Sequence, residues 1–136
     1  MRSGQASVEM VIILAISMTV ILLVLVIYDQ TSTSLLSQSS VSEAKAAVNN
    51  LADAIEAVHV QAVGARTTLF IQIPGNVKNF TLQNKILSAV LSGPGADRNI
   101  YRTFGFNVTG NLSVSPGTHL VNIESKIGYV EASTSS

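Results

Sequence analysis

The sequence predicts an α+β protein, in which a long N-terminal α-helix is followed by a small antiparallel β-sheet domain packed on the helix's second half. Three observations support this fold class. Residues 8–63 contain neither proline nor glycine, so nothing forces a helix to end there. Residues 10–28 are uncharged and almost entirely apolar. From Arg66 onward, β-branched residues alternate with polar ones between Gly/Pro-rich turns, which is typical of short strands.

The composition excludes several classes of protein. The chain has 136 residues, which suit one domain, and its eight Lys/Arg balance eight Asp/Glu. This balance gives no basic surface for nucleic acid. The absence of cysteine excludes a disulfide framework, a Cys-based zinc site and a Cys nucleophile. Hydrophobic residues make up 47% of the chain, but aromatic residues only 5%, so the hydrophobicity is aliphatic.

The first segment, residues 10–28, is long enough to cross a membrane. Seventeen of its 19 residues are hydrophobic, the exceptions being Ser17 and Thr19. As a helix it would span about 28 Å, close to the thickness of a bilayer's hydrocarbon core. Such a segment must meet a membrane or a very apolar partner, which excludes an ordinary cytosolic protein.

Three kinds of N-terminal segment fit this pattern to different degrees. A cleaved secretory signal peptide has a shorter apolar stretch and a small-residue cleavage site after it, but here residues 26–30 read VIYDQ. An ordinary membrane anchor, with Arg2 on the cytoplasmic side, remains open. The third possibility depends on Glu9.

Glu9 lies at the start of the apolar segment, where a carboxylate is costly unless it has a partner. A cut after Gly4 would give Gln5 a new α-amine and make Glu9 the fifth residue of the product. A free ammonium group and a buried carboxylate are natural partners. In a chain cut between Gly4 and Gln5, we therefore expect charge pairing between the Gln5 α-amine and Glu9.

Gly4, Gln5, Ser7, Glu9 and the apolar helix together resemble the class III signal peptide of archaeal type IV pilins, a short basic segment ending in Gly and followed by Gln-x-Ser-x-Glu. The resemblance implies that a prepilin peptidase removes the leader and leaves the helix in the product. It also implies partners: a pilus assembly ATPase and a membrane platform protein. The precursor would lie in the cytoplasmic membrane, and the product in an extracellular filament.

The expected organisation has four parts. Residues 1–4 form the leader, 5–30 the membrane or filament-core helix, 31–64 its amphipathic continuation and 65–136 a β-rich head. In the third part, apolar residues recur at helical spacing, and Gly64 suits a C-cap. These apolar residues are Val41, Ala44, Val48, Leu51, Ile55, Val58 and Ala62.

The expected head has six or seven short strands. The candidate runs are residues 69–73, 77–82, 85–91, 100–108, 112–114, 120–123 and 127–130, and Ser115-Pro116-Gly117 predicts a hairpin turn. In the fourth run, Phe104 and Val108 share one face, and Asn107 lies on the opposite, solvent face. So small a head needs the amphipathic helix to complete its core.

Three N-x-S/T sequons begin at Asn79, Asn107 and Asn111. All three fall in the part expected outside the cell, so we treat them as candidate N-glycosylation sites. The motif is short, and chance occurrence is the alternative.

No residue pattern points to catalysis. Glu56 and His59 share a helical face, with Asp53 one turn earlier, but a metal site needs further converging ligands, and His119 is the only other histidine. Gly93-Pro94-Gly95 lacks the Gly-Lys-Ser/Thr of a phosphate-binding loop. We therefore expect no enzyme activity, no cofactor or metal, and no nucleic-acid partner.

The expected function is a structural subunit of an extracellular type IV pilus, a helical homopolymer used in adhesion and assembled through the N-terminal helix. The alternatives are a membrane-anchored surface binding module, or a minor pilin that does not form the bulk filament. An anchored enzyme would need a polar cluster in the head, and the sequence contains none.

Overall fold

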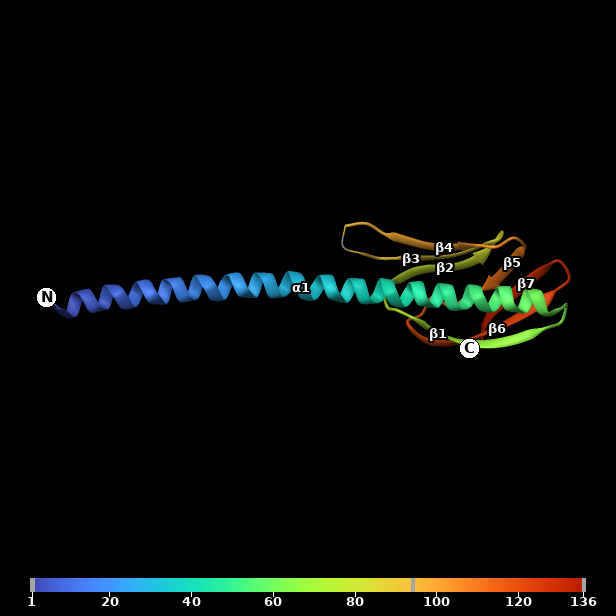
Figure 1. Ribbon diagram of the computed structural model, residues 1–136, viewed down its shortest axis with the longest axis horizontal. Helices are drawn as coiled ribbons and strands as arrows, with labels where there is room; N and C mark the ends of the chain where they lie inside the picture. Colours follow the sequence, from blue (N-terminus) through green and yellow to red (C-terminus); the bar gives the residue numbers. More distant parts are fainter. Residues whose placement is uncertain (1, 94, 136) are drawn as a thin grey trace. The chain divides into compact units, whose positions relative to one another are not determined.

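The computed structural model describes residues 2–93 and 95–135, and their chain divides into two compact units, Met1–Leu36 and Ser37–Ser136. Helix α1 spans Arg2–Gln61 and therefore contributes to both units (Figure 1). Residues 30–42, rich in Ser and Thr, are helical.

The C-terminal unit combines the end of α1 with one seven-stranded sheet over the described residues. The strands are β1 Arg66–Ile73, β2 Val77–Gln83, β3 Ile86–Leu91, β4 Arg98–Thr103, β5 Asn107–Asn111, β6 Gly117–Lys126 and β7 Tyr129–Ser135. Their order in the sheet is β1-β6-β7-β5-β2-β3-β4. The α+β class is therefore confirmed, and a sheet of seven strands makes this unit larger than a small head.

The sheet is mixed, so the expectation of a purely antiparallel sheet is wrong. Strands β5 and β7 run parallel, with Asn107 opposite Tyr129 and Asn111 opposite Ser133. All other neighbouring strands are antiparallel. A parallel neighbour needs a long connection, and here β6 and the turn after it provide that connection.

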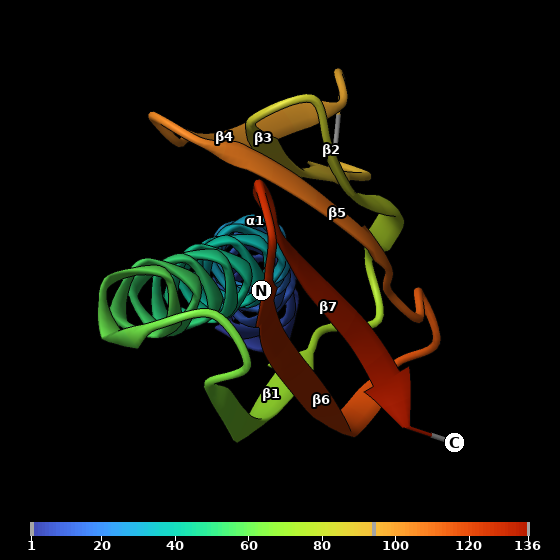
Figure 2. The ribbon, with the colours of Figure 1, turned by 90° about the vertical axis from the view of Figure 1, so that its right-hand side faces the viewer.

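The core of this unit contains side chains from α1 and from the sheet. Of the predicted helical stripe, Ala44, Val48, Leu51, Ile55 and Val58 are buried, Val41 is half-buried and Ala62 is exposed. They share one buried cluster with strand residues such as Leu82, Leu87, Val121 and Val130. Figure 2 shows the strands bending around the green end of α1. This clustering follows from the 3–4 spacing of the helix and the period of two in the strands.

Two predictions about strand boundaries are wrong. Residues 112–114 form no strand. Ser115-Pro116-Gly117 does not close a hairpin, because the strands on either side of it, β5 and β6, do not pair with each other. Strand β5 pairs with β7 and β2, whereas β6 pairs with β1 and β7. Residues 127–130 also do not form the last strand. Ile127 and Gly128 are the turn of the β6–β7 hairpin, in which Lys126 faces Tyr129. Local turn residues gave no information about which strands become neighbours.

The chain reverses at two other points with left-handed backbone conformations. Asn84 and Lys85 connect β2 to β3 with φ of +50° and +68°, as a type I′ hairpin turn requires. Gly64 has φ of +90° three residues after α1 ends, and its N–H donates to the Ser125 carbonyl at 2.7 Å. Gly64 thus lies in the turn between α1 and β1, as its position in the sequence suggested.

Candidate functional site

The most unusual surface of the protein is the apolar part of α1 in the N-terminal unit. The large hydrophobic side chains of residues 8–28 are each between 53% and 71% exposed, on every side of the helix (blue in Figure 1). A helix that is hydrophobic all round is normally buried in a core or in a membrane. This segment, called the apolar segment below, therefore requires a surrounding that its own unit does not provide.

The apolar segment satisfies its own polar groups. The Ser17 hydroxyl donates to the Ile13 carbonyl at 2.8 Å, and the Thr19 hydroxyl donates to the Ala15 carbonyl at 2.9 Å. Thr31 makes the same bond to Ile27 at 2.8 Å. Each hydroxyl donor is thus paired one turn back along the helix, so it can enter an environment without water.

Residues Gly4–Ser32 are long and apolar enough to cross a membrane, and none of this stretch is buried. A membrane anchor and a signal sequence both meet this description. The structure is therefore compatible with either of these, and both place the apolar segment in a membrane for part of the protein's existence.

The first turns of α1 contain the cleavage-site residue Gly4 and the motif residues Gln5, Ser7 and Glu9, and all four are exposed. A Cβ atom added at Gly4 would meet no atom within 4 Å. Gln5 and Glu9 are four residues apart, so they lie on one helical face, and helical side chains lean toward the N-terminus. Glu9 thus lies about one helical turn after Gln5, and the peptide bond between Gly4 and Gln5 is helical.

The sequon asparagines Asn79, Asn107 and Asn111 are all exposed, in β2 and β5. Asn107 is exposed and Val108 is buried, as predicted, but residues 100–108 are not one strand, because Phe104 lies between β4 and β5. Asn79 and Asn111 line the same surface hollow between β2 and β5.

The hydroxyls of the three sequons differ in their hydrogen bonds. The Thr81 and Ser88 hydroxyls lie 2.8 Å apart, and those of Ser113 and Ser115 lie 2.7 Å apart. Thr109 is exposed, and its hydroxyl has no hydrogen-bond partner among the described residues. Asn107 is thus the sequon whose third residue is most open in the folded protein.

The acidic residues of the second half of α1 contact a cation of the sheet. Arg102 of β4 lies 3.4 Å from Asp53 and 3.6 Å from Glu56. His59 stacks on Phe106, with ring centroids 3.7 Å apart. Within the described residues, no group of three or more His, Cys, Asp or Glu could hold a metal ion. Sequence reasoning did not identify Arg102, because its partners lie about 50 residues away.

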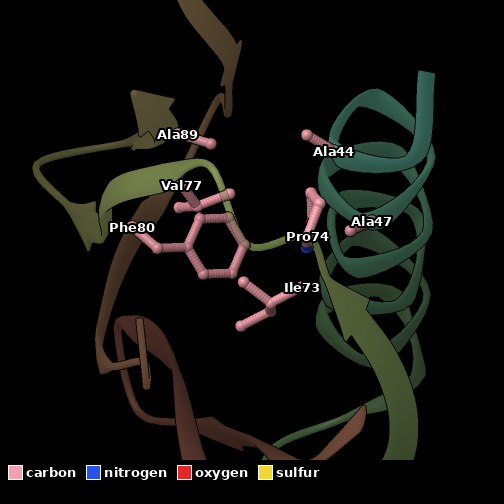
Figure 3. Close-up of a pocket in the computed structure, with 7 residues that line it drawn as sticks. All are labelled: Ala44, Ala47, Ile73, Pro74, Val77, Phe80 and Ala89. Carbon is pink, nitrogen blue, oxygen red and sulfur yellow. The ribbon is translucent and has the colours of Figure 1, made fainter. Parts of the chain in front are cut away.

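Two further features of the C-terminal unit are His119 and a small apolar hollow. One ring nitrogen of His119 lies 2.7 Å from the Ser115 carbonyl oxygen. Figure 3 shows the hollow between α1 and the sheet, with a volume of about 10 Å³. Its walls are entirely apolar, formed by Ala44, Ala47, Ile73, Pro74, Val77, Phe80 and Ala89. A space of this size holds about one water molecule and no organic ligand.

Comparison with protein-family models, with curated proteins and with solved structures finds no match for this chain. The features that bear on its function are therefore the apolar segment, the motif residues at the start of α1 and the exposed sequons.

Proposed function

We propose that this protein is a structural subunit of an extracellular type IV pilus, and that it polymerises through its apolar segment after the leader, residues 1–4, is removed. The observation that carries the proposal is a helix exposed and apolar on all sides, with one carboxylate, Glu9, at its start and the Gly4–Gln5 bond just before it. A simple anchor explains the apolar residues, but it does not explain the Gln-x-Ser-x-Glu pattern.

The apolar segment can serve in two environments without ever meeting water. Before assembly it lies in the lipid bilayer, and after assembly it packs against the same segments of other copies. This change exchanges one apolar surrounding for another, so its free-energy cost is small compared with exposure to water. The paired hydroxyls of Ser17 and Thr19 support both environments, because neither leaves a donor unsatisfied.

Glu9 would form an ion pair in the assembled filament. After cleavage, the Gln5 α-amine is the nearest new positive charge on the helical face of Glu9. Pairing within one subunit or between neighbouring subunits neutralises two charges that would each be costly if buried alone.

The C-terminal unit would then lie outside the cell, because Arg2 favours a cytoplasmic start for the apolar segment. This orientation places the sequons of Asn79, Asn107 and Asn111 where a glycan could be attached and adhesive contacts could form. Of the three, Asn107 is the first choice for modification of the folded protein. The assembly ATPase, the platform protein and the peptidase follow from the resemblance to archaeal pilins.

The decisive measurement is the intact mass and the N-terminal sequence of the protein sheared from the cell surface. We expect a chain that begins at Gln5, is recovered from filaments and is heavier than its sequence mass. A chain that begins at Met1, recovered only from detergent-solubilised membranes, would instead favour the membrane-anchored binding module.

A substitution at the cleavage site tests processing separately. Gly4→Leu should leave the full-length chain in the membrane, because a side chain is added where the peptidase must approach the backbone. Ala6→Leu is the matched control, since residue 6 is a variable position of the motif. Normal filaments from the Gly4→Leu variant would refute the cleavage site.

A substitution of Glu9 tests the charge pairing. Glu9→Leu should be processed and inserted into the membrane, but its filament yield should fall strongly, because the Gln5 α-amine loses its partner. Glu43→Leu removes a carboxylate from the other half of α1 and is the control. Equal filament yields from the two variants would remove Glu9 from the mechanism.

A further inference from the structure

Strand β7 occupies a position that divides the sheet. It lies between β6 and β5, antiparallel to the first and parallel to the second, although it is the last strand in sequence (Figure 2). Strands β5 and β6 do not pair with each other. Without β7, the sheet therefore consists of two separate pieces, β1–β6 and β5–β2–β3–β4.

The space that β7 fills is matched to its side chains. Val130 and Ala132 are fully buried, facing the core with Leu82, Val108 and Ile123. The third inward residue, Thr134, accepts a hydrogen bond from the Ser113 N–H at 2.9 Å. The site thus requires an extended segment with two small or β-branched apolar residues and one hydroxyl at alternate positions.

The wall of this space is also matched to the backbone of β7. A Cβ atom at Gly110 of β5 would lie 2.1 Å from the Ala132 carbonyl oxygen, a distance that no real contact allows. Glycine at this position therefore lets the two parallel backbones approach closely. Because this contact involves the main chain, it depends on the presence of β7 and not on its covalent connection.

The covalent connection between β6 and β7 is a turn of a less common type. The Ile127–Gly128 turn has positive φ only at Gly128, and Ile127 is 85% exposed. Two-residue hairpins favour turns with positive φ at the first or at both positions, as Asn84 and Lys85 have between β2 and β3. The β6–β7 turn is thus not the preferred type, and the binding of β7 depends on its contacts with the sheet.

We propose that the gap between β5 and β6 is a strand-binding site, that its ligand is the chain's own β7, and that the same strand supplied by a second molecule fills it. The site binds the backbone of the strand through the hydrogen bonds of β5 on one side and β6 on the other. It selects the sequence through the spaces that residues 130, 132 and 134 fill. It is independent of the proposed pilus function, because it concerns the completion of the C-terminal unit.

The test uses the full-length chain in detergent, with a protease recognition sequence inserted between Ile127 and Gly128. The folded protein is cut in this turn, the released strand is washed out, and a fluorescent peptide with the sequence of residues 129–135 is added. Fluorescence anisotropy reports peptide binding, and circular dichroism reports thermal unfolding. A chain ending at Lys126, refolded with and without the peptide, gives the same two readouts if the insertion prevents folding.

We expect loss of the cooperative unfolding transition when β7 is removed, and its return when the peptide binds. A peptide carrying Val130→Asp should bind at least about tenfold more weakly, because the substitution places a carboxylate in the core. A peptide carrying Glu131→Gln changes an outward residue and should bind like the natural one. An unchanged transition after β7 is removed would overturn the proposal, as would equal binding of the natural and Val130→Asp peptides.

Discussion

The two halves of α1 both carry aliphatic residues but use them in opposite ways. In the apolar segment the large side chains are exposed on every side, whereas Val48, Leu51 and Ile55 of the second half are completely buried. The second half places its apolar residues on one stripe, and a sheet from the same chain covers that stripe. The comparison indicates that the second half completes a fold, while the first half requires partners from outside its unit.

The largest expected effect comes from truncating a side chain on the buried stripe. Leu51→Ala should lower the free energy of unfolding of the C-terminal unit by about 2–5 kcal/mol, because it leaves a cavity in the core. Leu23→Ala makes the same chemical change where the side chain is 59% exposed, and should alter that free energy by less than about 0.5 kcal/mol. Urea unfolding in detergent, followed by circular dichroism, measures both. Similar losses would show that the two halves do not differ as the exposures indicate.

A lysine introduced into the middle of each half of α1 tests whether only the first half enters a membrane. Val20→Lys should weaken membrane insertion by about 2.5–3.5 kcal/mol, because the ammonium group must enter the hydrocarbon core. Ala57→Lys places the same charge on the exposed face of the second half and should leave insertion unchanged. Carbonate extraction of membranes measures the fraction retained. Full retention of the Val20→Lys chain would contradict a membrane position for the apolar segment.

A smaller effect is expected at the closest backbone approach in the sheet. Gly110→Ala should destabilise the C-terminal unit by about 1–3 kcal/mol, because the Ala132 carbonyl must move away. Gly105→Ala adds the same methyl group where no atom lies within 4 Å, and serves as the control. Thermal unfolding should separate the two variants, and identical melting temperatures would contradict the tight packing of β5 against β7.

The smallest effect is expected at an exposed ion pair between β6 and β7. The hydrogen bond from Lys126 to Glu131 raises the pKa of Lys126, and the nearby charges of Tyr129 and Glu124 add to this shift. The pair's contribution to stability is present below the ordinary lysine pKa and is lost as the pH rises through the raised pKa. In the Lys126→Met variant, the melting temperature should fall less as the pH rises through this range, because the ion pair is already absent. An unchanged pH dependence would show that the pair contributes nothing.

The sequence predicted the secondary structure of this protein better than its strand order. The stripe of Ala44, Val48, Leu51, Ile55 and Val58 follows directly from helical spacing, and the alternation around Asn107 from the period of a strand. Which strands become neighbours depends on contacts far apart in sequence. The insertion of β7 between β5 and β6 therefore had no local signal, and Ser115-Pro116-Gly117 was wrongly interpreted as a hairpin turn.

The candidate site was predictable to the extent that it depends on single residues. The apolar segment and the exposure of Asn107 follow from residue type and spacing. The importance of Gly110 did not, because a glycine in a turn-rich stretch gives no sign that another backbone lies against it. The contacts of Arg102 with Asp53 and Glu56 were missed for the same reason, since they join a helix and a strand distant in sequence.

The inward bonding of Ser17 and Thr19 has a consequence for how the apolar segment chooses its neighbours. With both hydroxyls donating to the helix's own carbonyls, residues 10–27 offer a neighbouring helix no free hydroxyl donor. The contacts of this stretch with an apolar neighbour then depend mainly on the shapes of aliphatic side chains. Such contacts can shift along or around the helix without breaking a hydrogen bond that these two hydroxyls donate.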